Sequence, residues 1–475
     1  MWDRNAWLLL GVAALAVFFA LATPAVAAEQ SQIPHSQLYE ALPFAGLLLS
    51  IALGPIVAKR IWHVHYGWAA GAWALLALIL MISSEGLAPT ESALVRTILI
   101  DYLPFILMLF ALYATAGGIV VSDFDRATPR LNTLLLALGT VASSLIGATG
   151  ASMIFIRPLL QANAKRHHKA HVVIFFIFLV SNIGGVLTPL GNPPLFFGFL
   201  RGVDFFWPLR MLWPHLLFTA ILVLAIFYVI DNRLARREVK MPTALASDTL
   251  HLAFRGWPNL LLILVAVAAI LLSAFWRPGI AFELFGTKLE LQNLFCNGAL
   301  ALAGLISLAI TPKEDRAANH FSWEPLEEVA KLFAAIFITI IPVVAMVAAN
   351  SHGPFAPVIA LLEHADGSPN NAAYFWASGL LSSFLDNGPT YLVFFVVAGG
   401  HAATLMGPLA KTLEAISLGA VFMGALTYIG NAPNFLVFAL ARRARVDMPG
   451  FFGYMAWSTA VLVPVFALLT LVFFC

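Results

Sequence analysis

Long apolar stretches, separated by short polar segments, follow one another along this chain. In the first part they lie near 41–58, 66–83, 101–121, 132–162, 172–200 and 210–231, and in the second near 257–276, 295–312, 330–349, 372–398, 412–440 and 451–474. An apolar run of about 20 residues can cross a bilayer as an α-helix. Because the runs are continuous rather than alternating, they favour helices over the strands of a membrane barrel. The pattern predicts an all-α polytopic membrane protein.

The composition excludes several other classes. Hydrophobic residues make up 61% of the chain and charged residues 11%, against roughly a quarter charged in soluble proteins. A net charge of +2 leaves no basic surface for nucleic acid, and two cysteines cannot form a disulfide framework. The sequence has no phosphate-binding P-loop, His-Glu-x-x-His motif or Gly-x-Ser-x-Gly elbow. We therefore expect no enzyme and no cofactor apart from a transported or coupling ion.

Residues 1–28 have the pattern of a secretory signal peptide. Arg4 precedes an apolar run over 7–21, and the small residues Ala25 and Ala27 are typical of a cleavage site. An uncleaved first transmembrane helix is the alternative, because Asp3 offsets the charge of Arg4.

Basic residues between the stretches predict the orientation in a bacterial-type inner membrane, because Lys and Arg near span ends prefer the cytoplasm. Stretch 132–162 is too long for one simple crossing, contains a Ser-Gly-rich segment over 143–152, and has basic residues on both sides. Both its ends are then cytoplasmic, which predicts a re-entrant helical hairpin. Stretch 372–398 breaks at 386–389 and is expected to form a second hairpin that opens on the opposite face.

Two motifs recur at the same spacing. A Ser-Ser pair at 143–144 recurs at 382–383, and a Thr-x-x-Gly-Asn-x-Pro motif at 188–194 recurs at 427–433, both 239 residues later. Interrupted helices at matching positions of inverted repeats are typical of secondary transporters. The alternative is that each Gly-Asn-x-Pro motif is an ordinary loop at a span end.

The repeat predicts how the chain is divided. An odd number of crossings between the halves would make the second half inverted relative to the first. Each half is expected to contain a hairpin followed by a broken helix. The predicted segments are repeat 1 at 40–231 with its broken helix at 172–200, a cytoplasmic linker at 232–256, and repeat 2 at 257–475 with its broken helix at 412–440.

At these motifs the chain resembles the ion-transporter superfamily, which includes NhaD-type sodium/proton antiporters, ArsB-type arsenite permeases, citrate transporters and divalent-anion/sodium symporters. The resemblance covers most of 40–475. The tip at 385–389 is most similar to the NhaD and citrate branches, whereas the tip at 147–152 lacks the Ser-Asn-Thr sequence of sodium/dicarboxylate symporters. The resemblance implies a homodimer in the lipid bilayer, with a scaffold part and a moving transport part.

The hairpin tips and broken helices are expected to meet at one site. Gly191 and Gly430 permit unwinding, and the prolines after them prevent a regular helix. An interrupted helix offers N–H groups and a positive dipole end to an anion, and free carbonyls to a cation. The expected site consists of Ser143, Ser144, Thr149, Asn182, Thr188, Gly191, Asn192, Ser383, Asp386, Asn387, Thr427, Gly430 and Asn431.

Asp386 is the carboxylate of this set, and its repeat mate is Gly147, so the fold does not demand an acid there. A charge at membrane depth is costly and indicates a functional group, here one at which H⁺ and Na⁺ compete. A helix cap is the alternative role. Na⁺ would be held at the tips by Asn192, Asp386, Asn387 and Asn431.

Four other polar residues have weaker assignments. Arg157, in the returning arm of the first hairpin, is either an anion contact or gate or a side chain that snorkels to the surface. Glu414 is expected at the rim of the second broken helix. His215 and His352 are expected in satisfied or interfacial positions rather than in a proton relay.

The sequence thus predicts a secondary active transporter that works by alternating access. The first hypothesis is sodium/proton antiport through Asp386. The alternative is a sodium- or proton-coupled symporter of citrate or another small anion, favoured by Arg157 and the half-helix N-termini. A channel on the same scaffold is a third hypothesis, against which the paired hairpins argue.

Overall fold

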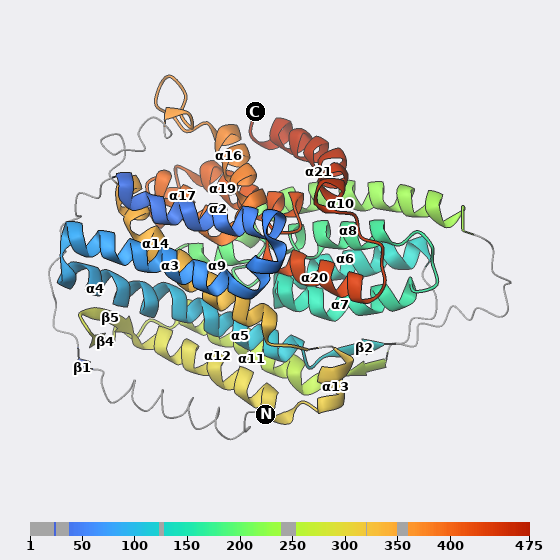
Figure 1. Cartoon of the computed structure of the whole chain (residues 1–475), viewed down its shortest axis with the longest axis horizontal. Helices are drawn as coiled ribbons and strands as arrows, with labels where there is room; N and C mark the ends of the chain where they lie inside the picture. The colour runs from blue at the N-terminus through green and yellow to red at the C-terminus, as the bar shows by residue number, and fades with distance from the viewer. Residues whose placement is uncertain (1–22, 25–37, 123–127, 239–252, 320, 349–359) are drawn as a thin grey trace.

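A computed structural model describes residues 23–24, 38–122, 128–238, 253–319, 321–348 and 360–475, and helices form most of this described part (Figure 1). Eight helices in this described part are long and apolar enough to cross a membrane. The predicted all-α polytopic membrane protein is therefore confirmed. The predicted leader at 1–28 lies outside the described residues except for 23–24, as do His352 and residues 239–252 of the predicted linker.

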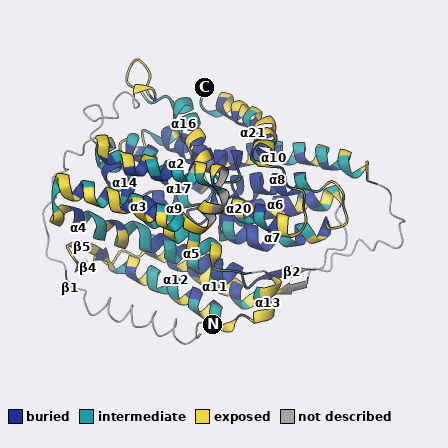
Figure 2. Ribbon diagram, in the orientation of Figure 1, coloured by how far each residue is buried: buried dark blue, intermediate teal, exposed yellow. Residues whose placement is uncertain are grey.

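One group of helices packs around α5 and α14. Helix α4 continues through a π-helical segment, η2, into α5, which contacts α11 and α12, while α3 contacts α2 and α14. Large apolar residues are exposed on α2, α3, α11 and α12, as expected of faces that contact lipid. Figure 2 shows how exposed and buried residues are distributed over the helices. We call this the first helix group: α2 (Leu42–Val57), α3 (Lys59–Glu85), α4 (Leu87–Arg96), η2 (Thr97–Tyr102), α5 (Leu103–Ala116), α11 (Trp257–Phe275), α12 (Leu291–Ile310) and α14 (Glu324–Ala348).

A second helix group contains all the predicted hairpins and broken helices. Its centre is formed by α8 and α19, which are buried over 171–179 and 412–422. Helices that are apolar on all sides are typical of positions surrounded by other helices. The group comprises α6 (Pro129–Ile146), α7 (Ala148–Ala162), α8 (Ala170–Leu179), η3 (Ile183–Val186), α9 (Pro193–Leu200), α10 (Trp207–Ala235), α16 (Asn371–Phe384), α17 (Asn387–Val397), α19 (Ala410–Phe422), η5 (Met423–Leu426), α20 (Ala432–Arg443) and α21 (Phe451–Phe473).

The long apolar stretches are interrupted where the sequence indicates. Stretch 132–162 divides into α6 and α7 at Gly147, and stretch 372–398 divides into α16 and α17 at Leu385 and Asp386. In both pairs the two helices pack against each other. Stretches 172–200 and 412–440 each consist of a helix, a short 3₁₀ turn, a non-helical segment and a second helix.

Short strands, which the sequence pattern does not predict, connect some of the helices. Strands β4 (Ala281–Leu284) and β5 (Thr287–Glu290) form an antiparallel hairpin, and β1 (Thr23–Pro24) pairs with β4. The hairpin turn has positive φ at both Phe285 and Gly286, the backbone of a type I′ turn. Strand β2 (Val120–Ser122) pairs with β3 (Ala253–Arg255), so the chain after α5 is held beside the start of α11.

Candidate transport site

The two broken helices meet through buried asparagines. Asn431 Nδ2 lies 3.3 Å from Asn192 Oδ1, 3.2 Å from Asn182 Oδ1 and 3.0 Å from the Ser181 carbonyl oxygen. Asn182 in turn donates to Asn434 Oδ1 at 2.7 Å. All four asparagines are at most 1% exposed. The breaks in the two halves of the chain therefore form one continuous polar centre.

Local sequence explains why these side chains reach across. Asn192 and Asn431 are the N-cap residues of α9 and α20, both with extended backbone and with proline in the first two positions of the helix that follows. Neither side chain caps its own helix, so its amide is available to the other break. A Cβ on Gly191 would collide with the Gly185 carbonyl oxygen, so the close approach of the backbone there requires glycine.

Each helix pair is attached to the break of the same half by an equivalent hydrogen bond. Thr188 Oγ1 donates to the Ser144 carbonyl, and Thr427 Oγ1 donates to the Ser383 carbonyl at 2.5 Å. Both bonds span 44 residues, and the two threonines are 239 residues apart. A further bond joins Ala148 N–H to the Gly191 carbonyl at 2.8 Å. The tip of the first pair is thus fixed on the first break.

Asp386 caps α17 and also lines a cavity. Its Oδ1 accepts from Gly388 N–H at 3.2 Å, and its carbonyl accepts from Thr390 Oγ1 at 3.1 Å. The cavity beside it has a volume of about 50 Å³, room for a few water-sized groups. Both helix groups line it: the first through α5 and α14, the second through Thr149, Pro193, Asp386, Asn431, Ala432, Pro433 and Leu436.

Several predicted residues carry buried polar atoms that have no hydrogen-bond partner within the described part of the chain. These atoms are both amide atoms of Asn387, the hydroxyl of Ser143 and Oδ1 of Asn431. Each of the three residues is at most 1% exposed. An unpaired buried polar group is costly, and a bound water or ion is a usual reason for one.

Arg157 lies apart from these residues. Its guanidinium donates to the carbonyl of Ala318 and, at 3.2 Å, to Oδ1 of Asn319. Both acceptors lie at the end of α13 (Lys313–Ala318), between α12 and α14 of the first helix group. The structure therefore joins Arg157 to the neighbouring helix group rather than to the tip residues.

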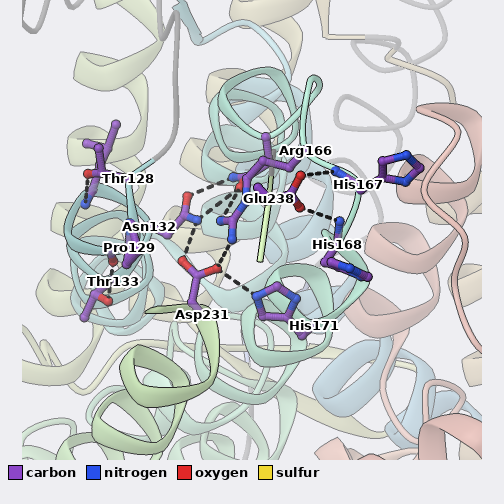
Figure 3. A network of polar contacts seen from close by, with 12 residues as sticks. Thr128, Pro129, Asn132, Thr133, Arg166, His167, His168, His171, Asp231 and Glu238 are labelled. Carbon is purple, nitrogen blue, oxygen red and sulfur yellow. Dashed lines mark hydrogen bonds and ion pairs between the residues drawn. The ribbon is translucent and has the colours of Figure 1, made fainter. Parts of the chain in front are cut away.

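A second polar cluster, absent from our sequence-based site, lies at the outer end of α6 and α7 (Figure 3). Asp231, which is fully buried, contacts Arg166 at 2.6 Å and His171 at 2.8 Å, and accepts from Asn132 at 3.0 Å. Asn163 bonds both Asn132 and Arg166. The sequence signal is an acid at the end of one apolar stretch, an asparagine at the start of another, and basic residues after 162.

Two of the weaker assignments need correction. Glu414 is 2% exposed, so the rim position belongs to Lys411, one turn earlier, rather than to Glu414 itself. His215 is also 2% exposed, and neither ring nitrogen forms a well-oriented hydrogen bond with any described residue. It is therefore buried inside the protein rather than interfacial, beside the backbone of Met211 and the Glu414 carboxylate. The two side chains lie 3.5 Å apart.

Comparison with known proteins gives one result over nearly the whole chain. A family model described as "Putative citrate transport" matches residues 33–474. A search of the curated proteins found no match to the chain.

Proposed function

Because the chain belongs to this citrate-transport family, we propose that it is a secondary active transporter that moves a small carboxylate anion together with Na⁺ or H⁺. The helices long enough to cross a membrane and the family match support secondary transport. The choice of an anion and of symport is our proposal, and the cavity beside Asp386 is the observation that carries it.

Four helix N-termini contribute to the lining of this cavity. Thr149 lies in the first turn of α7, Pro193 is the first residue of α9, and Asp386 and Asn431 are the N-cap residues of α17 and α20. The positive ends of these helix dipoles favour an anion. Side-chain oxygens of Asp386 and Asn431 in the same lining are suited to a hard cation such as Na⁺.

We propose further that the two halves are inverted repeats with re-entrant hairpins. The 239-residue offset, the equivalent threonine bonds and the contact between Asn192 and Asn431 support this arrangement. The outer ends of α6 and α7 meet through Asn132 and Asn163, as in a hairpin. In this proposal the protein works as a homodimer in a bacterial-type inner membrane.

Alternating access would then require the two helix groups to move relative to each other. The cavity lies between them, with α5 and α14 on one side and the tips and breaks on the other. At about 50 Å³ it is too small for an anion with several carboxylates, so a displacement of α14 from the tips would be needed to admit one.

Sodium/proton antiport is the second candidate, and one observation favours it. Asp386 places a carboxylate on the cavity, and Na⁺ and H⁺ can compete for one carboxylate without any anion. The two functions differ in whether transport of the cation depends on a carboxylate substrate.

Uptake by proteoliposomes separates the candidates. We expect labelled citrate to accumulate under an inward Na⁺ or H⁺ gradient and not without one. Citrate-independent acidification or alkalinisation of the lumen under a Na⁺ gradient would instead establish antiport. Calorimetric titration of Na⁺ at about pH 6 and about pH 8.5, with and without citrate, gives an independent answer. Binding of Na⁺ that tightens with citrate supports symport, and binding that ignores citrate but weakens in acid supports antiport.

A further inference from the structure

A buried acid–histidine pair lies outside the cavity. It is formed by α10 and α19, which belong to neither of the helix pairs α6–α7 and α16–α17. His215 on α10 and Glu414 on α19 are each 2% exposed, with Nε2 and Oε2 3.5 Å apart. The same Oε2 lies 3.1 Å from the ammonium of Lys411, whose side chain is 56% exposed. The rings of Phe473 and Phe474, centred 4.1 and 6.1 Å from the imidazole, cover the pair.

The imidazole is left without a good partner. The backbone of Met211, one turn before it, and the Glu414 carboxylate lie beside the ring, but neither contact has good hydrogen-bond geometry. A buried histidine normally has at least one nitrogen bonded, because an unpaired polar group away from water is costly. One proton shared between the imidazole and the carboxylate would satisfy both groups.

Two further buried hydroxyls without a well-oriented partner lie one turn beyond the pair on the same two helices. Thr219, one turn after His215, and Ser417, one turn after Glu414, are both fully buried without a well-oriented partner among the described residues. The Ser417 hydroxyl lies close to that of Tyr391 on α17. Tyr391 is one turn from Asn387, the tip residue whose amide atoms are both unpaired. Polar groups thus lead from the exposed Lys411 towards the tip that carries Asp386.

The pair faces few other charges. Helix α21 presents Phe473 and Phe474 to it, and Tyr454 of that helix is bonded to the Ala425 carbonyl. Arg210, earlier on α10, is paired with Asp204. The other titratable groups on α10 and α19 and on the described elements packed against them lie farther along these helices or at their ends. They are Arg130 on α6, Tyr374 on α16, Tyr391 on α17, His401 before α18 (Ala402–Met406), Cys475 after α21, and Tyr228, Arg233 and the cluster of His171, Asp231 and Arg166 towards the far end of α10.

We infer that His215 and Glu414 form a proton-binding site, distinct from the cavity at Asp386, that takes up the coupling proton and passes it inward along Ser417 and Tyr391. A proton from the aqueous phase near Lys411 binds the Glu414 carboxylate. The O–H group that forms then donates a hydrogen bond to the imidazole of His215. Its departure leaves the carboxylate paired with Lys411. This inference rests on the proposed function, because a coupling proton presupposes a coupled transporter.

Infrared difference spectroscopy of the purified protein in lipid tests proton binding without any substrate. We expect a carboxylic C=O band that appears as the pH is lowered and belongs to protonated Glu414. The band should vanish in Glu414→Gln, shift its midpoint in His215→Gln, and persist in Asp204→Asn, an exposed carboxylate used as the control. It should also persist in Asp386→Asn, which separates this site from the cavity.

Proteoliposomes test the coupling. An imposed pH gradient should raise uptake in the wild-type protein and in Asp204→Asn, whereas in Glu414→Gln uptake with the gradient should no longer exceed uptake without it. Difference spectra that are identical in the wild type and Glu414→Gln, or gradient-driven accumulation that survives in that variant, would overturn the inference. If citrate is not the substrate, the proposed function fails but the spectroscopic result still decides the proton site.

Discussion

Asn132 and Asn163 exchange side-chain hydrogen bonds, with Nδ2-to-Oδ1 distances of 3.1 and 2.8 Å. Asn132 lies at the start of α6 and Asn163 directly follows α7, so the exchange ties the outer ends of this helix pair together. Asn132 also donates a hydrogen bond to Asp231, which links the helix pair to α10. The first pair and α10 are therefore held as one body, and we expect the transport cycle to leave these contacts intact.

Removing the charge of Asp231 is expected to destabilise the protein strongly. In Asp231→Asn the buried guanidinium of Arg166 loses its carboxylate partner, and breaking a buried ion pair in this way costs about 3–5 kcal/mol. Thermal unfolding in detergent measures the loss. The control is Asp204→Asn, in an ion pair with Arg210 whose side chains are 40% and 65% exposed, where the expected change is below about 1 kcal/mol. Equal effects would show that the Asp231 cluster is not a structural element.

The turn between α6 and α7 is expected to require glycine. Gly147 has a φ of +83° and a ψ of 147°, and a Cβ there would lie 3.0 Å from the Leu190 carbonyl oxygen. Gly147→Ala should lower stability by about 1–3 kcal/mol. Gly298→Ala in α12, where a Cβ meets nothing within 4 Å, should be neutral or stabilising by up to about 1 kcal/mol. A wild-type unfolding midpoint for Gly147→Ala would mean that the turn relaxes.

The equivalent threonine bonds should have similar strengths. Thr188→Val and Thr427→Val keep the shape of the side chain but remove the hydroxyl that binds the Ser144 or Ser383 carbonyl. Each substitution should cost about 1–3 kcal/mol, because a carbonyl inside the protein is left unpaired. Thr427→Val also takes the acceptor from the Gly430 N–H, so its effect should lie at the upper end of the range. The unfolding midpoints of the two variants are compared directly. An effect in one half only would argue that the two tips are attached differently.

Asp386 is expected to combine a structural and a functional role that substitution can separate. Asn caps a helix about as well as Asp, so Asp386→Asn should change stability by less than about 1 kcal/mol while abolishing or uncoupling transport. Asp386→Ala also removes the cap and should cost about 0.5–2 kcal/mol. Uptake and unfolding are measured on the same preparations. Wild-type uptake by the Asn variant would leave Asp386 with the cap alone.

Much of this architecture follows from the sequence because bilayer thickness limits the length of apolar runs. The apolar runs indicate the spans. The Thr-x-x-Gly-Asn-x-Pro motifs within them indicate the breaks, because two backbone segments approach closely at Gly191 and at Gly430. The π-helical segment Thr97–Tyr102 and the strands at 281–290 gave no such signal, because neither interrupts the apolar pattern in a recognisable way.

The polar partners were harder to anticipate because they depend on contacts between distant segments. The position of Glu414 near a helix start suggested the rim, yet His215, 199 residues earlier in the chain, faces it inside the protein. Asp231 follows an apolar run like any span end, and only the packing of α10 against α6 and α8 buries it. The local sequence does not specify such pairings. The predicted site residues remain a prediction, although many of them converge on the breaks and the cavity.

The contact between Asn192 and Asn431 has a meaning beyond its hydrogen bond. In a two-fold symmetric dimer, a residue on the axis touches its own copy. These asparagines lie 239 residues apart, and under the inverted repeat proposed above they make, within one polypeptide, the contact that two half-length chains would make across their axis. When the two halves belong to one chain, the residues at equivalent positions can differ. Gly147 and Asp386 are such a pair, one neutral and one acidic. A symmetric dimer would have to carry either two acids or none at its tips, whereas this chain carries one.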